Sequence, residues 1–207
     1  MNLLVRIVAH KLFALSVLVG VGVWLLVIPA FTGGLGANPV EKLLHQTGEI
    51  AIWTLGAVLA LTPLRILFPR SRLVNALNRH RRMIGVTACI YGLLHFSSHI
   101  LLRRRLGQPL AEFYEAIHLV QASPVLTILV ILALTSNQWS IRKLGGKTGS
   151  ACTALPYVAA ALLIYHQAIA GKGHWYIARW LFFTLVTLEL ARLAKTYLRV
   201  RSAPEPG

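Results

Sequence analysis

Histidines inside apolar segments are the residues of this chain best suited to chemistry. His95 and His99 lie within an apolar stretch over 83–102, and His166 lies within another over 152–170. A side chain that can ionise is costly inside a membrane and usually serves a function there. Neutral imidazole is a good ligand for iron and places no charge in an apolar environment.

Two of these histidines are expected at one depth. His95 follows Met83 by twelve residues, about 18 Å along a helix, and His166 follows Cys152 by fourteen, about 21 Å. Both helices are expected to run in the same direction, so the imidazoles could bind one haem iron from opposite faces. Such ligation suits electron transfer. The alternative is that each histidine hydrogen-bonds between helices.

Further polar residues near His95 could assist. His99 follows one helical turn later and could be another ligand or a partner of a haem propionate. Arg103, Arg104 and Arg105 could bind propionates through charge-assisted hydrogen bonds. A solvated basic run against lipid headgroups explains these arginines equally well. The sequence contains no CxxCH, so the haem would be held without covalent bonds.

The elements that must position these residues are membrane-spanning helices. The chain has 207 residues, of which 56% are hydrophobic and only 13% charged, with a mean hydropathy of +0.65. A soluble domain has about 25% charged residues. We expect an all-α polytopic membrane helix bundle in a single domain, 1–201, followed by a disordered tail, 202–207. About six spans are predicted, at 12–31, 50–68, 83–102, 116–134, 152–170 and 175–193.

The positive charge predicts the orientation. The formal net charge is +15, and the basic residues gather between the apolar segments, which is typical of membrane proteins and not of nucleic-acid binding. Most Lys and Arg lie at the termini and in the second and fourth connections. The positive-inside rule then places both termini in the cytoplasm. The connection 107–123 has amphipathic spacing and is expected at the outer membrane interface, in contact with lipid.

Several short motifs occur in an order that resembles one known family. The first connection reads Gly33-Gly34-Leu35-Gly36-Ala37-Asn38-Pro39-Val40-Glu41, followed by His45, Thr47 and Gly48. The pattern is similar to the G-x-L-G-A-[ND]-P-V…H-x-T-G signature of the MsrQ (YedZ) family. Later matches are Thr62-Pro63-Leu64, Arg81-Arg82-Met83-Ile84-Gly85, Leu94-His95, Thr135-Ser136, Arg142-Lys143-Leu144-Gly145 and Tyr165-His166.

The resemblance implies a ferric-reductase-like fold of six helices that binds b-type haem, with His95 and His166 as axial ligands. It implies an electron-transfer subunit, not a complete enzyme, in the bacterial inner membrane. Electrons would come from the quinol pool or from a cytoplasmic flavin reductase, with quinone or FMN involved. They would pass to a periplasmic MsrP-like molybdopterin subunit that repairs methionine sulfoxide.

The sequence departs from the family at one position that concerns the number of haems. Thr153 stands where the family has a further histidine, and threonine is a poor iron ligand. His80, fifteen residues before His95, could serve an inner haem only with a second ligand from elsewhere. We therefore expect one haem.

Two residues of the first connection, Glu41 and His45, are candidates for shaping the haem edge or a docking face for the partner. The alternative is that Gly33, Gly34 and Pro39 only build a tight loop.

Two other functions remain open on sequence grounds. A ferric reductase with its own substrate would need a nucleotide-binding unit, and the chain contains no G-x-G-x-x-G motif. A haem-free transporter or scaffold with structural histidines would show no chromophore. Interrupted helices would favour transport, and Pro63 and Pro156 are the residues that could interrupt them.

Overall fold

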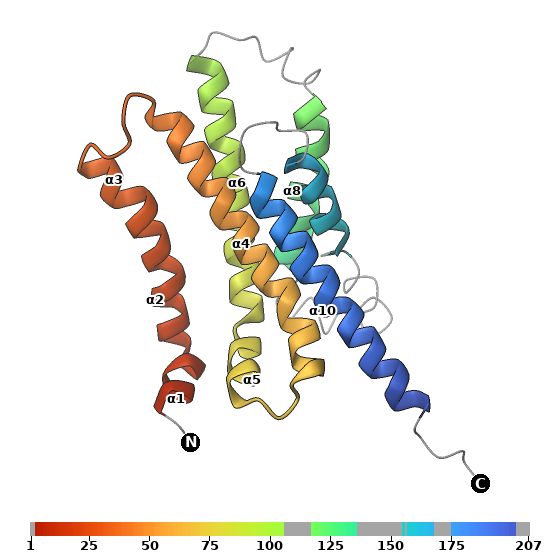
Figure 1. Ribbon diagram of the computed structural model, residues 1–207. Coiled ribbons are helices and arrows are strands. Elements are labelled where there is room, and N and C mark those ends of the chain that lie inside the picture. Colours follow the sequence, from red (N-terminus) through yellow and green to blue (C-terminus); the bar gives the residue numbers. More distant parts are fainter. Residues whose placement is uncertain (1–2, 106–116, 136–154, 156, 168–174, 202–207) are drawn as a thin grey trace.

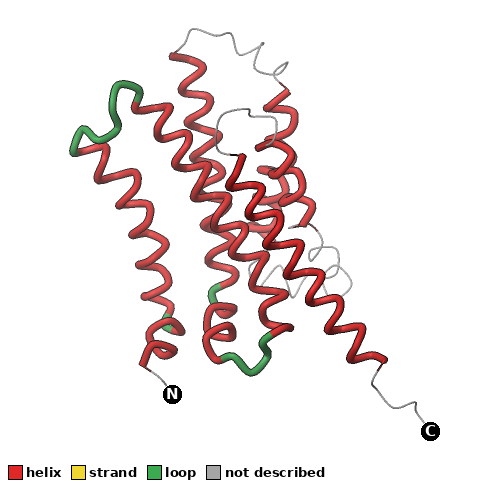
Figure 2. The backbone as a smooth tube through the Cα atoms, viewed as in Figure 1, coloured by secondary structure: helices red, strands yellow, loops and turns green. Residues whose placement is uncertain are grey.

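The protein is a bundle of long helices in the computed structural model (Figures 1 and 2). The structure describes residues 3–105, 117–135, 155, 157–167 and 175–201, and these contain no strand. Within these residues, three helices are long and apolar enough to cross a membrane, and a shorter apolar helix covers Ser123–Thr135. The predicted all-α polytopic membrane bundle is confirmed. Helix α1 and the C-terminal end of α10 lie at the same end of the bundle (Figure 1).

The first spanning helix stands at the edge of the bundle. After α1 (Leu3–Ala9), it continues through α2 (Lys11–Gly22), a π-helical turn η1 (Val23–Val27) and α3 (Ile28–Phe31). Only 6% of its most apolar stretch is buried, against 44% for the next spanning helix. Most of its side chains are therefore left to face lipid. Gly22 is the exception, because the Tyr91 side chain fills the space where a Cβ would be.

Helix α4 (Pro39–Leu67) is the centre of the bundle and packs mainly against α6 and α10. It begins eleven residues before the predicted span, so Glu41 and His45 lie in its first turns. The prediction that they belong to a loop is wrong. Pro39 is at the first helical position, where its missing N–H costs nothing. At the other end, Lys195 Nζ donates to the carbonyls of Ile66 (3.0 Å) and Leu67 (2.6 Å).

The second connection contains a short helix that the sequence did not lead us to expect. Helix α5 (Arg72–Arg79) starts after Ser71, whose hydroxyl accepts from Val74 N at 3.4 Å. The next helix, α6 (Arg81–Arg105), contains the whole of the predicted third span. Between them His80 is buried, and its Nε2 lies 2.9 Å from the carbonyl of Val8. This contact connects α1, which precedes the first spanning helix, to the bundle.

The second half of the chain supplies three more helical segments. They are α8 (Ile117–Thr135), residues 157–167 and α10 (Trp175–Arg201). Helix α10 runs eight residues beyond the predicted sixth span. The core joins all these segments to α4 and α6 through Leu55, Leu59, Ala88, Cys89, Val125, Leu129, Ala160 and Leu185. Most of the predicted 107–123 helix, Thr153 and the tail lie outside the described residues.

One polar cluster ties residues 157–167 to α10. Tyr157 Oη donates to Glu189 Oε1 at 2.6 Å, and Arg192 Nε lies 2.8 Å from Glu189 Oε2. The carboxylate is thus paired both with a cation and with a hydroxyl, which makes its partial burial tolerable.

Candidate functional site

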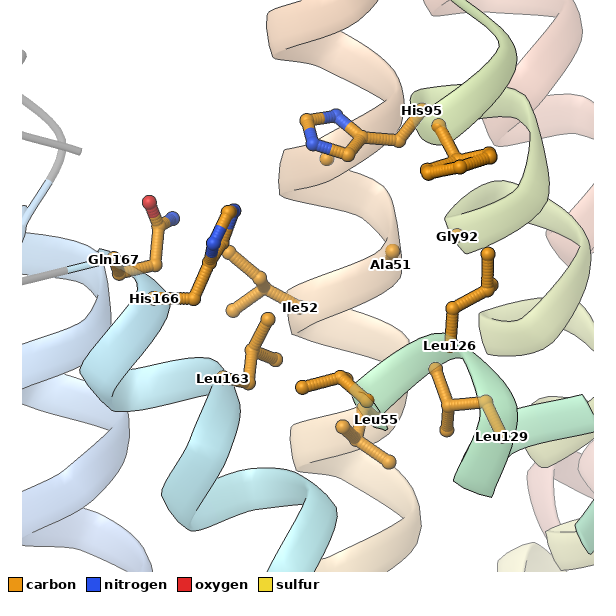
Figure 3. A pocket seen from close by; sticks show the side chains of 13 residues that line it. Ala51, Ile52, Leu55, Gly92, His95, Leu126, Leu129, Leu163, His166 and Gln167 are labelled. Carbon is orange, nitrogen blue, oxygen red and sulfur yellow. The ribbon is translucent and has the colours of Figure 1, made fainter. Parts of the chain in front are cut away.

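A largely apolar cavity lies between α4, α6, α8 and residues 157–167 (Figure 3). Its empty volume is about 660 Å³, including the part open to the surroundings, and 13 residues line it. Two of its polar residues are the histidines that the depth comparison singled out, His95 and His166. Gln167 is next to the second of them and also lines the cavity.

The His95 ring is held in one orientation by α4. Its Nδ1 lies 2.9 Å from the carbonyl oxygen of Leu44. A carbonyl can only accept a hydrogen bond, so this contact requires the proton on Nδ1 and leaves the Nε2 lone pair for a metal. Metal-bound histidines commonly have this arrangement, because the hydrogen bond fixes the tautomer and raises the basicity of the ligating nitrogen.

Small residues make room for this ring and for the cavity. A Cβ on Gly48 would lie 2.8 Å from His95 Nδ1, closer than real Cβ contacts allow. Gly92 lies one turn before His95 on α6, and a Cβ there would contact Leu126 and Leu129 at 3.6 and 3.7 Å. Together with Ala51, these residues leave an open apolar space beside the imidazole.

His166 reaches the same cavity from the opposite wall. It lies near the end of residues 157–167, is half-buried, and its ring points into the space that the His95 ring also enters (Figure 3). The structure therefore brings together two histidines that are 71 positions apart in the sequence. Their coordination of iron stays a prediction.

The residues of the cavity fit a haem. Two neutral imidazoles from facing helices would provide nitrogen ligands of the kind that haem iron takes in proteins. The remaining walls are mostly aliphatic, with glycines and the ring of Phe96, which suits a flat apolar macrocycle. Among the residues that the structure describes, no Asp, Glu, Lys or Arg lines the cavity, so none of these would place a charge next to a bound haem.

The other histidines proposed from the sequence do not line this cavity. His99 is half-buried one turn further along α6. His80 lies at the other end of α6, where its Nε2 is engaged by the backbone carbonyl of Val8. A role for either in cofactor binding stays a prediction.

Arg103, Arg104 and Arg105 form the last turn of α6, and the Arg104 side chain is exposed. The side chains of Arg103 and Arg105 lie outside what the structure describes. The proposed contact of these arginines with propionates is thus untested.

The connection before α4 is a well-built turn. Gly33 and Gly36 have φ of +71°, a conformation that glycine adopts without strain. Lys42 Nζ donates to the Gly34 carbonyl at 2.5 Å, which fastens the turn to α4. Of the three residues predicted to build a tight loop, Gly33 and Gly34 lie in this turn, whereas Pro39 begins α4.

Glu41 and His45 are partly exposed near this turn and face each other. His45 Nε2 lies 3.9 Å from Glu41 Oε1, and about 40% of each side chain is exposed. Asn38 Nδ2 donates to the other oxygen of Glu41 at 2.8 Å. A docking role for this pair remains open.

Sequence reasoning missed the residues that orient and surround the ligands. Gly92 could have been found, because it precedes His95 by three residues and so shares its face of the helix. Gly48 is part of the quoted signature, but nothing in the sequence links it to His95. The contribution of Leu44 is a backbone carbonyl, for which side-chain patterns carry no signal.

The chain is similar to curated proteins from several Brucella species. The proteins of Brucella ovis, Brucella canis and Brucella suis are each 36% identical to it over 182 residues. The match covers 86% of this chain and 79% of each relative, and each relative is named protein-methionine-sulfoxide reductase heme-binding subunit MsrQ. No family model matches the chain, and no solved structure does.

Proposed function

The chain belongs to the MsrQ family, and from this we propose that it is a haem-binding electron-transfer subunit of a methionine sulfoxide reductase system, with His95 and His166 as the axial ligands. The observation that carries the proposal is the shared cavity, into which one imidazole projects from α6 and the other from residues 157–167. A haem bound there supplies a reversible one-electron couple.

The residues around the cavity have distinct tasks in this proposal. The Leu44 carbonyl holds the proton on His95 Nδ1, so that the other nitrogen keeps its lone pair. The aliphatic walls keep water away from the ligands and lower the local dielectric constant. If His95 and His166 both held the haem iron, no coordination site would be left for oxygen or substrate, which would favour electron transfer over chemistry at the iron.

The place of the cavity in the bundle supports a direction for the electrons. The cavity lies near the middle of α4 and α6, and His95 is nearer to Arg105 than to Arg81, the end of α6 on the side of the bundle where α1 and the C-terminal end of α10 lie (Figure 1). If the basic end that carries both termini faces the cytoplasm of the inner membrane, the cavity lies nearer the periplasm. Electrons would then leave to a periplasmic MsrP-like molybdopterin subunit.

The proposal includes one b-type haem and an electron donor on the cytoplasmic side, either quinol or a reduced flavin such as FMN. One haem is proposed because Thr153 stands where the family has a further histidine. A complete reductase is not proposed, because the methionine sulfoxide chemistry would take place on the partner.

The test is a reduced-minus-oxidised absorption spectrum of the purified chain, with haem quantified as the pyridine haemochrome. We expect close to one b-type haem per chain in the wild type and its loss in both His95→Ala and His166→Ala. His10→Ala is the control, since it removes an exposed imidazole that does not line the cavity, and it should keep the haem.

Haem retained in both cavity variants would overturn the ligand assignment. A wild-type chain without haem would favour a transporter or scaffold instead. Electron transfer is tested separately, by following reoxidation of the reduced chain on addition of a molybdopterin partner subunit, and an unchanged reoxidation rate would overturn that part of the proposal.

A further inference from the structure

A second hollow lies at the opposite end of the bundle, where α4 ends. Residues of α4, α5, α6 and α10 line it, among them Arg65, Arg81 and Arg199, and its empty volume is about 740 Å³. A neighbouring hollow of similar volume shares Arg199 with it and adds Arg70 and Lys195. This end is far from the histidine cavity and plays no part in the proposed haem site.

The residues known to line the first of these hollows give it a positive charge. Three arginines and no carboxylate are among its described lining residues. Within the described part of the chain, neither Arg65 nor Arg81 forms an ion pair, whereas Arg192 on the neighbouring helix is paired with Glu189. Arginines grouped in this way repel one another, and an anion between them would remove that cost. The planar guanidinium matches phosphate oxygens particularly well.

A buried hydroxyl in the same hollow points to a ligand independently of the charge. Thr62 Oγ1 is buried and has no hydrogen-bond partner among the described residues. Two other threonines of α4, Thr47 and Thr54, donate to the carbonyl four residues earlier at 2.7 Å. The Thr62 hydroxyl does not make this usual helix contact, so it is available to an acceptor in the hollow, which Asn78 also lines.

The surroundings of the hollow are apolar and exposed. Ile66 lines it and is 38% exposed, Phe68 follows at the end of α4 with 54%, and Leu198 precedes Arg199 with 63%. A basic hollow between helix ends, bordered by exposed apolar side chains, has the chemistry of a phospholipid: the headgroup meets the arginines and the acyl chains cover the apolar residues.

We propose that this hollow binds a phosphate group, that of an anionic phospholipid in the adjoining leaflet, through Arg65, Arg81 and Arg199 with the Thr62 hydroxyl as a further donor. The phosphate oxygens accept charge-assisted hydrogen bonds from the guanidinium groups. The lipid joins the end of α4 to α10 at the membrane surface. This proposal is independent of the haem assignment.

The test is native mass spectrometry of the full chain released from nanodiscs, supported by its melting temperature. The nanodiscs contain phosphatidylethanolamine alone or with phosphatidylglycerol or cardiolipin, and a third arm adds inorganic phosphate to the first kind. We compare the wild type with Arg65→Gln/Arg81→Gln. The matched control is Arg72→Gln/Arg79→Gln, which removes the same charge from exposed positions of α5 outside both hollows.

We expect the wild type and the control to retain anionic lipid and the Arg65/Arg81 variant to lose it, with a weakening of roughly 10- to 30-fold. If only inorganic phosphate stabilises the wild type, and this effect is lost in the Arg65/Arg81 variant, the hollow binds phosphate but the phosphate does not come from a lipid. If the wild type retains no anionic lipid in preference to phosphatidylethanolamine and gains no stability from phosphate, the proposal is wrong. That comparison needs no variant, so misfolding of a variant cannot obscure it.

Discussion

Replacing Gly48 by alanine tests whether α4 sets the orientation of His95. The new Cβ would lie 2.8 Å from His95 Nδ1 and 3.0 Å from Cε1. The ring must retreat by about 0.6 Å to reach the 3.4 Å at which ordinary van der Waals contact begins. Its hydrogen bond to the Leu44 carbonyl, now 2.9 Å, is then stretched or lost.

The expected size of the effect follows from that hydrogen bond. A typical hydrogen bond contributes about 0.5–1.5 kcal/mol net, and removing the partner of a metal-bound histidine commonly weakens metal binding by about 10- to 100-fold. We therefore expect haem affinity to fall on the order of tenfold. Alanine is a better helix former than glycine by about 1 kcal/mol, so the haem-free chain should not be destabilised on local grounds.

The assay is haem titration of the haem-free chain, together with a potentiometric titration of the loaded chain. The midpoint potential should rise in Gly48→Ala, because a ligand without its hydrogen bond to the carbonyl is less basic and stabilises the ferric state less. Gly85→Ala is the matched control on α6, since its Cβ would meet only Val58, at 3.9 Å. Unchanged affinity and potential in Gly48→Ala would refute the claim that α4 orients an iron ligand.

Three further substitutions test the contacts that hold the helices together. Glu189→Gln removes the ion pair with Arg192 and weakens the contact with Tyr157. It should lower the free energy of unfolding by about 1–3 kcal/mol, measured by thermal unfolding. An unchanged melting temperature would contradict the pairing. Lys195→Met removes both hydrogen bonds to the last carbonyls of α4 and should destabilise by about 1–2 kcal/mol, with exposed Lys11→Met as a control that should have no effect. His80→Ala should loosen the first spanning helix and speed limited proteolysis near α1 while the haem content stays unchanged; loss of haem would instead assign His80 a role in cofactor binding.

The spanning helices were predictable because a long apolar stretch can be recognised from neighbouring residues alone. The spans at 12–31 and 83–102 agree with the structure, since each is a mainly apolar stretch without Asp, Glu, Lys or Arg. The start of α4 was not predictable in this way. Its first turns contain Glu41, Lys42, His45, Gln46 and Glu49, whose polarity resembles a loop, and the helix there is stabilised by packing and by the fixed turn before it.

The two histidines were predictable as a pair, but their environment was not. Rise per residue gives the depth of His95 and His166, because that quantity depends only on helix geometry. The contact of His95 with α4 depends on how α4 and α6 cross. The close approach of the ring to α4 is possible because Gly48 has no side chain. Arg65 lies within the predicted second span and Arg81 in a motif of the second connection. Their gathering with Arg199 was not predictable, because it requires the last helix to lie beside α4.

The cavity walls are made at different times during synthesis. Gly48, Leu44 and His95 all precede residue 100, so α4 and α6 can pair and align the first imidazole as soon as they enter the membrane. His166 follows 71 residues later, roughly 4–14 s at ordinary elongation rates. Until then the first imidazole has its backbone partner but no opposite wall. Insertion of a prosthetic group into this space is therefore a late step in biogenesis. A chain interrupted before residue 166 would contain the first imidazole but not the second.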